Sequence, residues 1–171
     1  MQIEARRADI TREDVDAIVN AANVHLARGD GVCGAIFAAA GPDLDAACAA
    51  LGGCGTGDAK ATPGFALPAR WIVHTVGPVW HGGGHGEADL LASCYRRSVE
   101  VASGVGARSI AFPAISTGIF GYPIAEAAAV AVPATQDALG EHPSIEHVRF
   151  VVFNDETERA FSAAVSESRT S

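Results

Sequence analysis

The sequence has almost no lysine and little positive charge of any kind. Lys60 is the only lysine, the arginines are scattered along the chain, and the formal net charge is −8. A protein that binds nucleic acid as a polyanion normally needs a basic patch, so we expect no nucleic-acid partner. Any anion that the chain binds must be held chiefly by groups other than cationic side chains.

Several features that would assign the chain to other classes are also missing. Gly, Pro or charge interrupts every apolar run before it reaches the length of a membrane span, and the N-terminal MQIEARRADI has no signal-peptide layout. We therefore expect a cytoplasmic protein with no membrane partner. The four cysteines show neither CxxC nor zinc-finger spacing, which favours reduced thiols. His81 and His85 are spaced to contact a metal, but a flexible loop is the better interpretation, and we predict no metal site.

The pattern that is present is an alternation of strands and helices. A chain of 171 residues, nearly half of them apolar, can bury the core of one domain, which we place at residues 1–165 with a frayed tail at 166–171. The alternation predicts an α/β fold, a three-layer α/β/α sandwich around a mixed, largely parallel sheet. Periodicity predicts strands at 3–7, 17–20, 58–62, 71–76, 109–113 and 148–153, and helices at 32–40, up to 51, 87–103, 123–139 and 156–165. We expect Pro133 to kink or split its helix, and Asn154 or Asp155 to cap the last one.

Two glycine-containing loops occupy equivalent positions in this order. The strand at 17–20 leads through GDGVCG into a helix, and the strand at 109–113 leads through AISTGIFGYP into another. Both loops leave the carboxyl ends of strands, where open α/β sheets bind ligands, and both offer backbone N–H groups near a helix N-terminus. Neither contains lysine, so phosphate binding would depend on backbone amides. The alternative is that both are ordinary connectors with glycines for tight turns.

These segments resemble a known family. DAIVNAAN, GDGVCGAIFAAAGPDL, LGGCGTGDAKATPGFALPARWIVHTVGPVW, EADLLASCYRRSVEVA and SIAFPAISTGIFGYP together resemble the macrodomains, and in particular the MacroD-type branch. That branch removes ADP-ribose from acidic side chains and deacetylates O-acetyl-ADP-ribose. The resemblance is collinear from about residue 2 to residue 161. It implies a monomeric chain without a cofactor, whose partners are ADP-ribose and ADP-ribosylated proteins.

The resemblance also implies site residues. Asp9 and the backbone of Ile10 match the adenine-reading position, Asn20 and Asn23 match the NAAN pair, and Phe153 is similar to the aromatic residue on adenine. The two phosphate loops correspond to Gly31, Val32, Cys33 and Gly34 and to Ser116, Thr117, Gly118, Ile119 and Phe120. Asn23 is expected to bind the distal ribose, and Phe120 to lie over it.

Each of these assignments has a plain structural alternative. Asp9 is also placed to cap a helix before ITRED, and Asn20 to hold only the loop backbone. Phe120 and Phe153 are also candidates for ordinary core residues.

The chain departs from the MacroD pattern where that pattern has its catalytic groups. Cys33 stands in place of an aspartate, Phe37 in place of a histidine, and Asp30 in place of a glycine. Hydrolysis of an ADP-ribosyl ester still needs a positioned water, which Asp30 or the substrate's own phosphate could activate. Cys33 could act as a thiolate, although a small filler facing the sheet is the favoured interpretation. We therefore assign Asn23 and Asp30 as catalytic candidates.

Three functions compete at this point. The leading one is hydrolysis of ADP-ribosyl esters, and the second is a non-catalytic ADP-ribose reader. The third is an ADP-ribose 1″-phosphate phosphatase that uses the same pocket.

Overall fold

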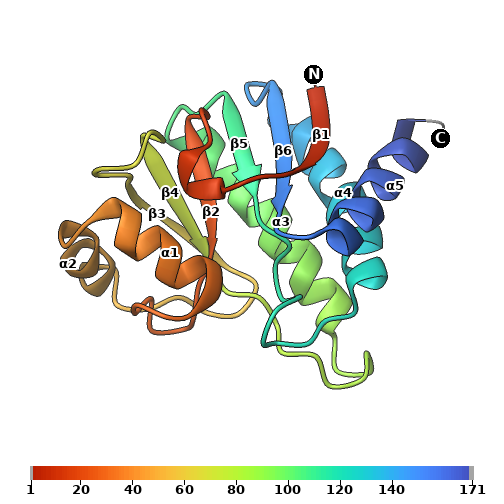
Figure 1. Ribbon diagram of the computed structural model, residues 1–171, viewed down its shortest axis with the longest axis horizontal. Coiled ribbons are helices and arrows are strands. Elements are labelled where there is room, and N and C mark those ends of the chain that lie inside the picture. Colours follow the sequence, from red (N-terminus) through yellow and green to blue (C-terminus); the bar gives the residue numbers. More distant parts are fainter. Residues whose placement is uncertain (1, 170–171) are drawn as a thin grey trace.

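A six-stranded sheet lies at the centre of the computed structural model, which describes residues 2–169 (Figure 1). Its strand order is β1-β6-β5-β2-β4-β3, and every neighbouring pair is parallel except β3 with β4. The strands are β1 (Gln2–Arg7), β2 (Ala17–Ala21), β3 (Ala59–Pro63), β4 (Trp71–Thr75), β5 (Ser109–Phe112) and β6 (His147–Val152). The predicted mixed, largely parallel sheet is confirmed.

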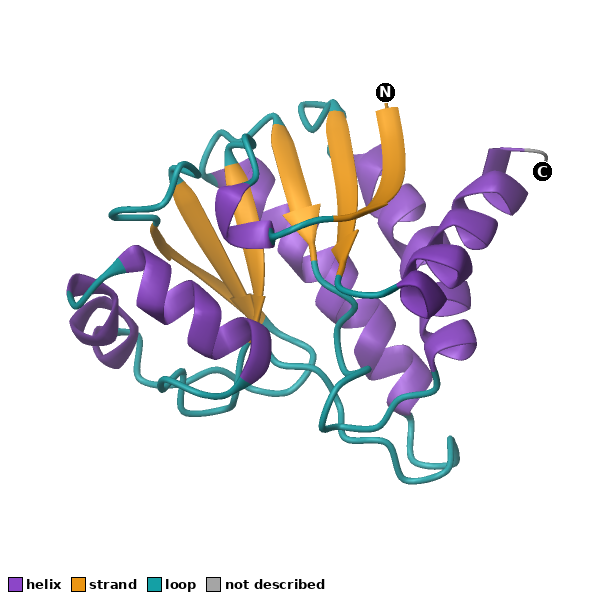
Figure 2. Ribbon diagram, in the orientation of Figure 1, coloured by secondary structure: helices purple, strands orange, loops and turns teal. Residues whose placement is uncertain are grey.

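Helices cover both faces of this sheet, which makes the three-layer sandwich that the alternation predicts (Figure 2). Because side chains alternate along a strand, β2 sends Val19 into one apolar core and Ile18 into the other. The first core includes side chains of α3, α4 and α5, and the second includes side chains of α1 and α2. The helices are η1 (Ile10–Arg12), α1 (Gly31–Ala40), α2 (Asp43–Ala50), α3 (Glu87–Gly104), α4 (Ile124–Glu141) and α5 (Asp155–Arg169).

Two details of the helices differ from the sequence expectation. Helix α4 runs through Pro133 without being split, because that residue lies on the solvent side while its neighbours Val132 and Ala134 are buried in the core. Residues 166–169, which we predicted to fray, continue α5, and Arg169 donates to the carbonyl of Ile3. Residues 170–171 of that predicted tail lie outside the described part of the chain.

The start of α5 agrees with the prediction. The Asn154 side chain accepts hydrogen bonds from the backbone and the hydroxyl of Thr157, at 2.9 and 2.8 Å, as a capping residue does.

The parallel strands place three loops at one edge of the sheet. Strands β6, β5 and β2 are neighbours, so their carboxyl ends lie side by side, and the loops that follow lead into α5, α4 and α1 (Figure 1). Neighbouring strands lie about 4.8 Å apart, so three strand ends span about 10 Å.

Within residues 2–169 no single helix is long and apolar enough to cross a membrane, although the bent pair α1 and α2 reaches that length together.

Candidate ligand-binding site

A cavity of about 390 Å³ opens at this edge of the sheet. Both glycine-containing loops contribute to it, as does the end of β6, so the structure brings together segments that are far apart in sequence. Its lining consists of Ala21–Asn23, Gly29–Cys33, Pro113, Ala114, Ser116–Phe120, Ile124, Val151–Asn154 and Thr157.

The first loop presents free backbone N–H groups at the start of α1. The N–H groups of Gly31, Val32 and Cys33 are in the first turn of the helix, where no preceding carbonyl is available, and none has an acceptor among residues 2–169. Gly31 has φ of +61°, a left-handed conformation that glycine adopts without strain. Such a row of N–H groups at a helix N-terminus favours an anion.

The second loop presents a matching set after β5. Its internal bonds run from the Thr117 N–H to the carbonyl of Ala114 and from the Tyr122 N–H to the carbonyl of Ser116. Ser116 is held at φ of +69°, in the left-handed region that non-glycine residues seldom adopt. Within the described chain, the N–H groups of Gly118, Ile119 and Phe120 donate to no internal acceptor, and these residues line the cavity. The two loops therefore face one cavity with two sets of unpaired donors.

Among residues 2–169, no cationic side chain lines the cavity. Arg28 flanks the first loop, but its guanidinium binds Asp45 at 3.0 Å and lies over the ring of Phe37 at 5.5 Å. Phe37, at the position where the MacroD pattern has histidine, is 1% exposed and belongs to the core. Anion binding at this site must therefore use backbone donors, as the lack of lysine in the loops predicts.

The β6 end of the cavity is mainly apolar. Val151, Val152 and Phe153 lie there, and Phe153 is 63% exposed, which is unusual for a phenylalanine that only fills a core. Ile119 on the second loop is 86% exposed and also lines the cavity. An open apolar surface beside backbone donors suits a flat aromatic group attached to an anion.

Two polar side chains lie at the first-loop end of the cavity. Asn23 holds its own loop in place: its amide donates to the carbonyl of Ala27 at 2.9 Å, and its oxygen accepts from the N–H groups of His25 and Ala27. Asp30 is exposed at the N-cap of α1, and its carboxylate makes no capping bond and no ion pair among residues 2–169. Asp30 is therefore the cavity-lining group that is free to act as a base.

Cys33 is a buried residue whose thiol faces the protein interior. It is 5% exposed, its sulfur accepts a long contact of 3.6 Å from the Asn20 amide, and it donates to the carbonyl of Ala27 at 3.7 Å. Asn20 in turn donates to Nδ1 of His74 at 3.1 Å, which places the imidazole proton on Nε2, 2.9 Å from the Thr62 hydroxyl. Burial lowers the pKa of His74 to about 4, so this buried layer beneath the cavity is uncharged at neutral pH.

Four predicted ligand residues do not line the cavity. Asn20 is fully buried and supports the loop beneath Cys33, and its role as a direct ligand contact stays a prediction. At Gly34 a Cβ would lie 2.6 Å from the carbonyl oxygen of Gly29, so the loop packs closely on α1 there, and the ligand role of Gly34 also stays a prediction. Asp9 caps η1 through bonds from Thr11, which hold the pKa of its carboxyl below the usual value. Its adenine-reading role, together with that of Ile10, stays a prediction.

Sequence reasoning missed part of the site. Val151, Val152 and Thr157 line the cavity, yet nothing in their local pattern distinguishes them from ordinary strand and helix residues. The position of β6 beside β5 would have been needed to find them. The buried His74 was also missed, because an isolated histidine in a strand gives no signal of its partner.

The comparisons with known proteins agree with this geometry. The family model described as Macro domain matches residues 19–131. A macro domain-containing protein of Chlorobaculum tepidum is 58% identical over 153 residues, which cover 90% of this chain and 89% of the relative.

Solved structures of macrodomains also match this chain. The Oceanobacillus iheyensis macrodomain with ADP matches with a TM-score of 0.92 at 39% identity, over 98% of this chain and 92% of that one. The Trypanosoma brucei macrodomain in complex with ADP-ribose matches with a TM-score of 0.89 at 39% identity, over 96% and 69%.

Proposed function

The chain belongs to the macro domain family, and from that premise we propose that it binds ADP-ribose and hydrolyses ADP-ribosyl esters. The substrates are mono-ADP-ribose on acidic side chains of proteins and O-acetyl-ADP-ribose. The observation that carries the proposal is the pair of opposed loops whose unpaired N–H groups face one cavity without any cation. A diphosphate fits such donors, and the related macrodomains of Oceanobacillus iheyensis and Trypanosoma brucei hold ADP and ADP-ribose.

The order of strand ends gives the ligand a direction. Adenine lies at the apolar β6 end beside Phe153, and the diphosphate lies between the two loops. The distal ribose lies at the β2 end, near Asn23 and Phe120. This orientation directs the ester toward Asp30.

The chemistry requires little from the protein beyond a held geometry. With the glutamate-linked substrate, water attacks C1″ of the distal ribose, the bond from C1″ to the ester oxygen breaks, and the glutamate leaves as a carboxylate, a good leaving group that needs little general-acid help. With O-acetyl-ADP-ribose, water attacks the acetyl carbon and the bond to the sugar oxygen breaks. In both cases the proton of the water passes to Asp30 or to the substrate's own phosphate, and with the acetyl ester it then passes to the departing sugar oxygen. Asn23 positions the distal ribose. General-base help is typically worth ~10²–10⁴-fold, so loss of the base alone leaves activity from positioning.

A reader that binds ADP-ribose without turnover is the second candidate. It is favoured by the placement of Cys33, whose thiol points to Asn20 and Ala27, and by the burial of Phe37. These residues stand where the MacroD pattern has an acid and a histidine, so neither supplies a replacement base.

One experiment separates the two candidates. The purified protein is incubated with a glutamate-linked ADP-ribosyl substrate, and released ADP-ribose is measured beside the Kd for free ADP-ribose. Release that Asn23→Ala abolishes in a folded protein supports the hydrolase and excludes the reader. Binding without release excludes the hydrolase, and release of inorganic phosphate from ADP-ribose 1″-phosphate would instead identify a phosphatase.

A further inference from the structure

A second cavity lies beside the loop between β5 and α4, which also lines the main cavity. It has a volume of about 320 Å³, and we call it the aromatic groove. Its walls are Trp80, Tyr122, Glu126, Val130, Ala88 and the backbone of Gly82–Gly83. It combines two aromatic rings with one carboxylate, and no lysine or arginine lines it.

The aromatic rings of the groove are held rigidly. The centroids of Trp80 and Tyr122 are 4.6 Å apart at an interplanar angle of 51°. Gly83 packs on the indole so closely that a Cβ there would lie 2.8 Å from Cη2 of Trp80. The backbone N–H of Trp80 donates to the carbonyl of Phe120 at 2.8 Å, which links the groove to the second phosphate loop.

Glu87 fixes the remaining wall. Its buried carboxylate accepts from the N–H groups of His81, Gly83 and His85 at 2.9, 2.9 and 2.6 Å. Burial acts to raise the pKa of Glu87, but these bonds outweigh it and lower the pKa to about 2. Glu87 is thus an ionised group that holds the loop in shape, whereas the neighbouring histidine side chains are exposed.

Glu126 is the charged group left free at the groove. It is exposed in the first turn of α4, and it makes no ion pair or side-chain hydrogen bond within the described residues. Burial raises the pKa of Tyr122, and the charges of Glu126 and Glu87 raise it further, which keeps the phenol neutral. A cation is therefore the complementary guest, since it is attracted both to the exposed Glu126 carboxylate and to the partly exposed ring of Trp80, which the buried Tyr122 supports.

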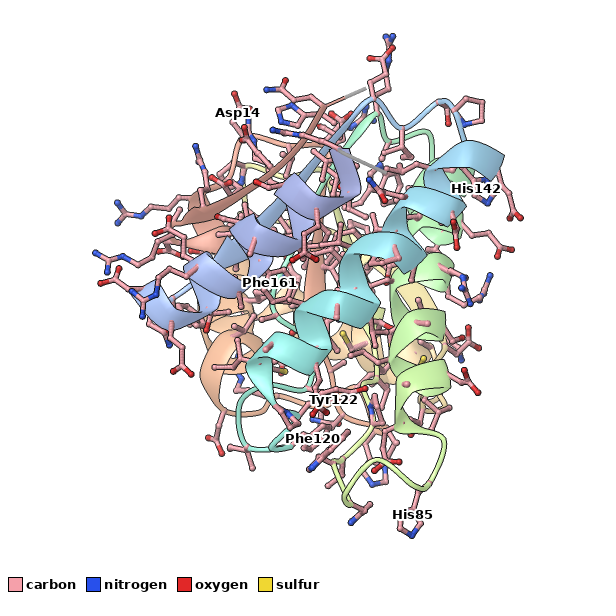
Figure 3. All side chains as sticks on the ribbon, turned by 90° about the vertical axis from the view of Figure 1, so that its right-hand side faces the viewer. Asp14, His85, Phe120, Tyr122, His142 and Phe161 are labelled. Atoms are coloured by element: carbon pink, nitrogen blue, oxygen red, sulfur yellow. The ribbon has the colours of Figure 1, made fainter. Side chains whose placement is uncertain are left out.

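The groove and the main cavity share the loop between β5 and α4, which contributes Phe120 to the main cavity and Tyr122 to the groove. Tyr122 lies two residues further along the chain than Phe120. Figure 3 shows both side chains below the start of α4, with His85 on the loop beyond them. Two residues span at most about 7 Å, so the backbones of Phe120 and Tyr122 lie within this distance, and a polypeptide attached to a distal ribose beside Phe120 needs only a few residues to reach the groove.

We propose that the aromatic groove binds a cationic side chain, best an arginine, of the ADP-ribosylated protein close to its modified acidic residue. This proposal rests on the proposed binding of ADP-ribosylated proteins, and it adds a preference for the sequence around the modified residue. The guanidinium stacks on Trp80 and pairs with Glu126. An exposed pair of this kind is worth a roughly three- to tenfold gain in affinity.

The test compares two peptides by calorimetry at physiological salt. Each carries ADP-ribose on glutamine through an amide, which withstands ester hydrolysis, with either arginine or citrulline two positions away on both sides. The wild-type protein is expected to bind the arginine peptide three- to tenfold more tightly. The Glu126→Gln variant should lose this difference and keep the Kd for free ADP-ribose. Glu141→Gln, at the far end of the same helix, removes the same charge and should keep the difference.

The outcomes separate this proposal from the proposed function. If free ADP-ribose binds but both peptides bind equally to the wild type, or the arginine preference survives in Glu126→Gln, the groove proposal is wrong and the function stands. If ADP-ribose does not bind, the proposed function fails. The groove is then tested alone by titrating the tryptophan fluorescence of the protein, which comes from Trp71 and Trp80, with arginine amide and citrulline amide. An arginine-selective change that Glu126→Gln abolishes supports it, and the absence of one overturns it.

Discussion

Asp30 carries the catalytic proposal at the scale of the single residue, because it is the cavity-lining carboxylate without a partner. We expect Asp30→Ala to lower the kcat of ester hydrolysis by about 10²-fold, within the usual range of general-base catalysis. Cys33→Ala should change it much less, since the thiol faces the interior. Single-turnover release of ADP-ribose measures both.

Binding should respond in the opposite direction. Removing a carboxylate beside a diphosphate relieves repulsion, so Asp30→Ala is expected to bind ADP-ribose as tightly as the wild type or more so. Unchanged turnover in both variants would refute the role of Asp30 and leave activation by the substrate's phosphate.

Gly34 provides a second residue-level prediction, about packing. A Cβ at this position would lie 2.6 Å from the carbonyl oxygen of Gly29, so Gly34→Ala must displace the first phosphate loop. Overpacking typically costs about 1–3 kcal/mol, and the free energy of unfolding should fall by that amount while the Kd for ADP-ribose rises. Urea unfolding and calorimetry measure the two effects.

Gly140 offers a matched control for that substitution. It lies inside α4, and a Cβ there meets nothing within 4 Å. Gly140→Ala should be neutral or stabilise the protein by up to about 1 kcal/mol, with the Kd unchanged. Equal effects of the two substitutions would show that the loop tolerates the side chain.

At the scale of the element, the buried layer between β2, β3 and β4 makes stability depend on pH. His74 is neutral when folded, because burial lowers its pKa from 6.5 to about 4. Between those values the unfolded chain takes up a proton that the folded chain resists, so stability falls as the pH drops from 6.5 to 4. The loss from His74 is about 3 kcal/mol over this window, and none arises above it.

His74→Gln removes this titration. The free energy of unfolding of the His74→Gln variant should be lower than that of the wild type at pH 7, since the bond with Asn20 is disturbed. Between pH 6.5 and 4.5 the free energy of unfolding of the variant should fall less steeply than that of the wild type. His142→Gln, at the end of α4, should retain the wild-type slope. Parallel slopes for all three proteins would contradict a buried neutral His74.

Most strands and helices could be predicted from the sequence alone, but some details of the helices could not. The strands and helices were predictable because their apolar periodicity reflects which faces are buried, as for Ile18 and Val19 on β2. We predicted that Pro133 would kink or split its helix; the split is wrong, because local propensity does not register that the neighbours of Pro133 are buried in the core. Fraying at 166–169 was inferred from composition, which gives no sign of the contact between Arg169 and Ile3.

The two loops of the site could be predicted from the sequence, whereas the buried residues that support those loops could not. Glycines and strand ends identify both anion-binding loops, because backbone donors need little from side chains. A motif does not tell which way a residue faces, so the burial of Asn20 and the close packing at Gly34 could not be read from it. Partners distant in sequence, such as Asn20 and His74, become visible only in three dimensions.

At the scale of the whole molecule, the net charge of the protein and the charge of its proposed ligand are both negative. The chain carries a formal charge of −8, and no cation lines the cavity, so binding of ADP-ribose releases few counterions. We expect the Kd to change less than about threefold between 50 and 500 mM NaCl, and to fall rather than rise, because salt screens the repulsion. Calorimetry across this range measures it, and a steep weakening with salt would reveal ion pairs that this account excludes.

The most direct test of the central claim is release of ADP-ribose from a glutamate-linked substrate, measured at a protein concentration that saturates binding of free ADP-ribose. The account predicts steady release by the wild type, loss of release in Asn23→Ala with the fold intact, and reduced release in Asp30→Ala. Binding of ADP-ribose with no release would contradict it and make the protein a reader.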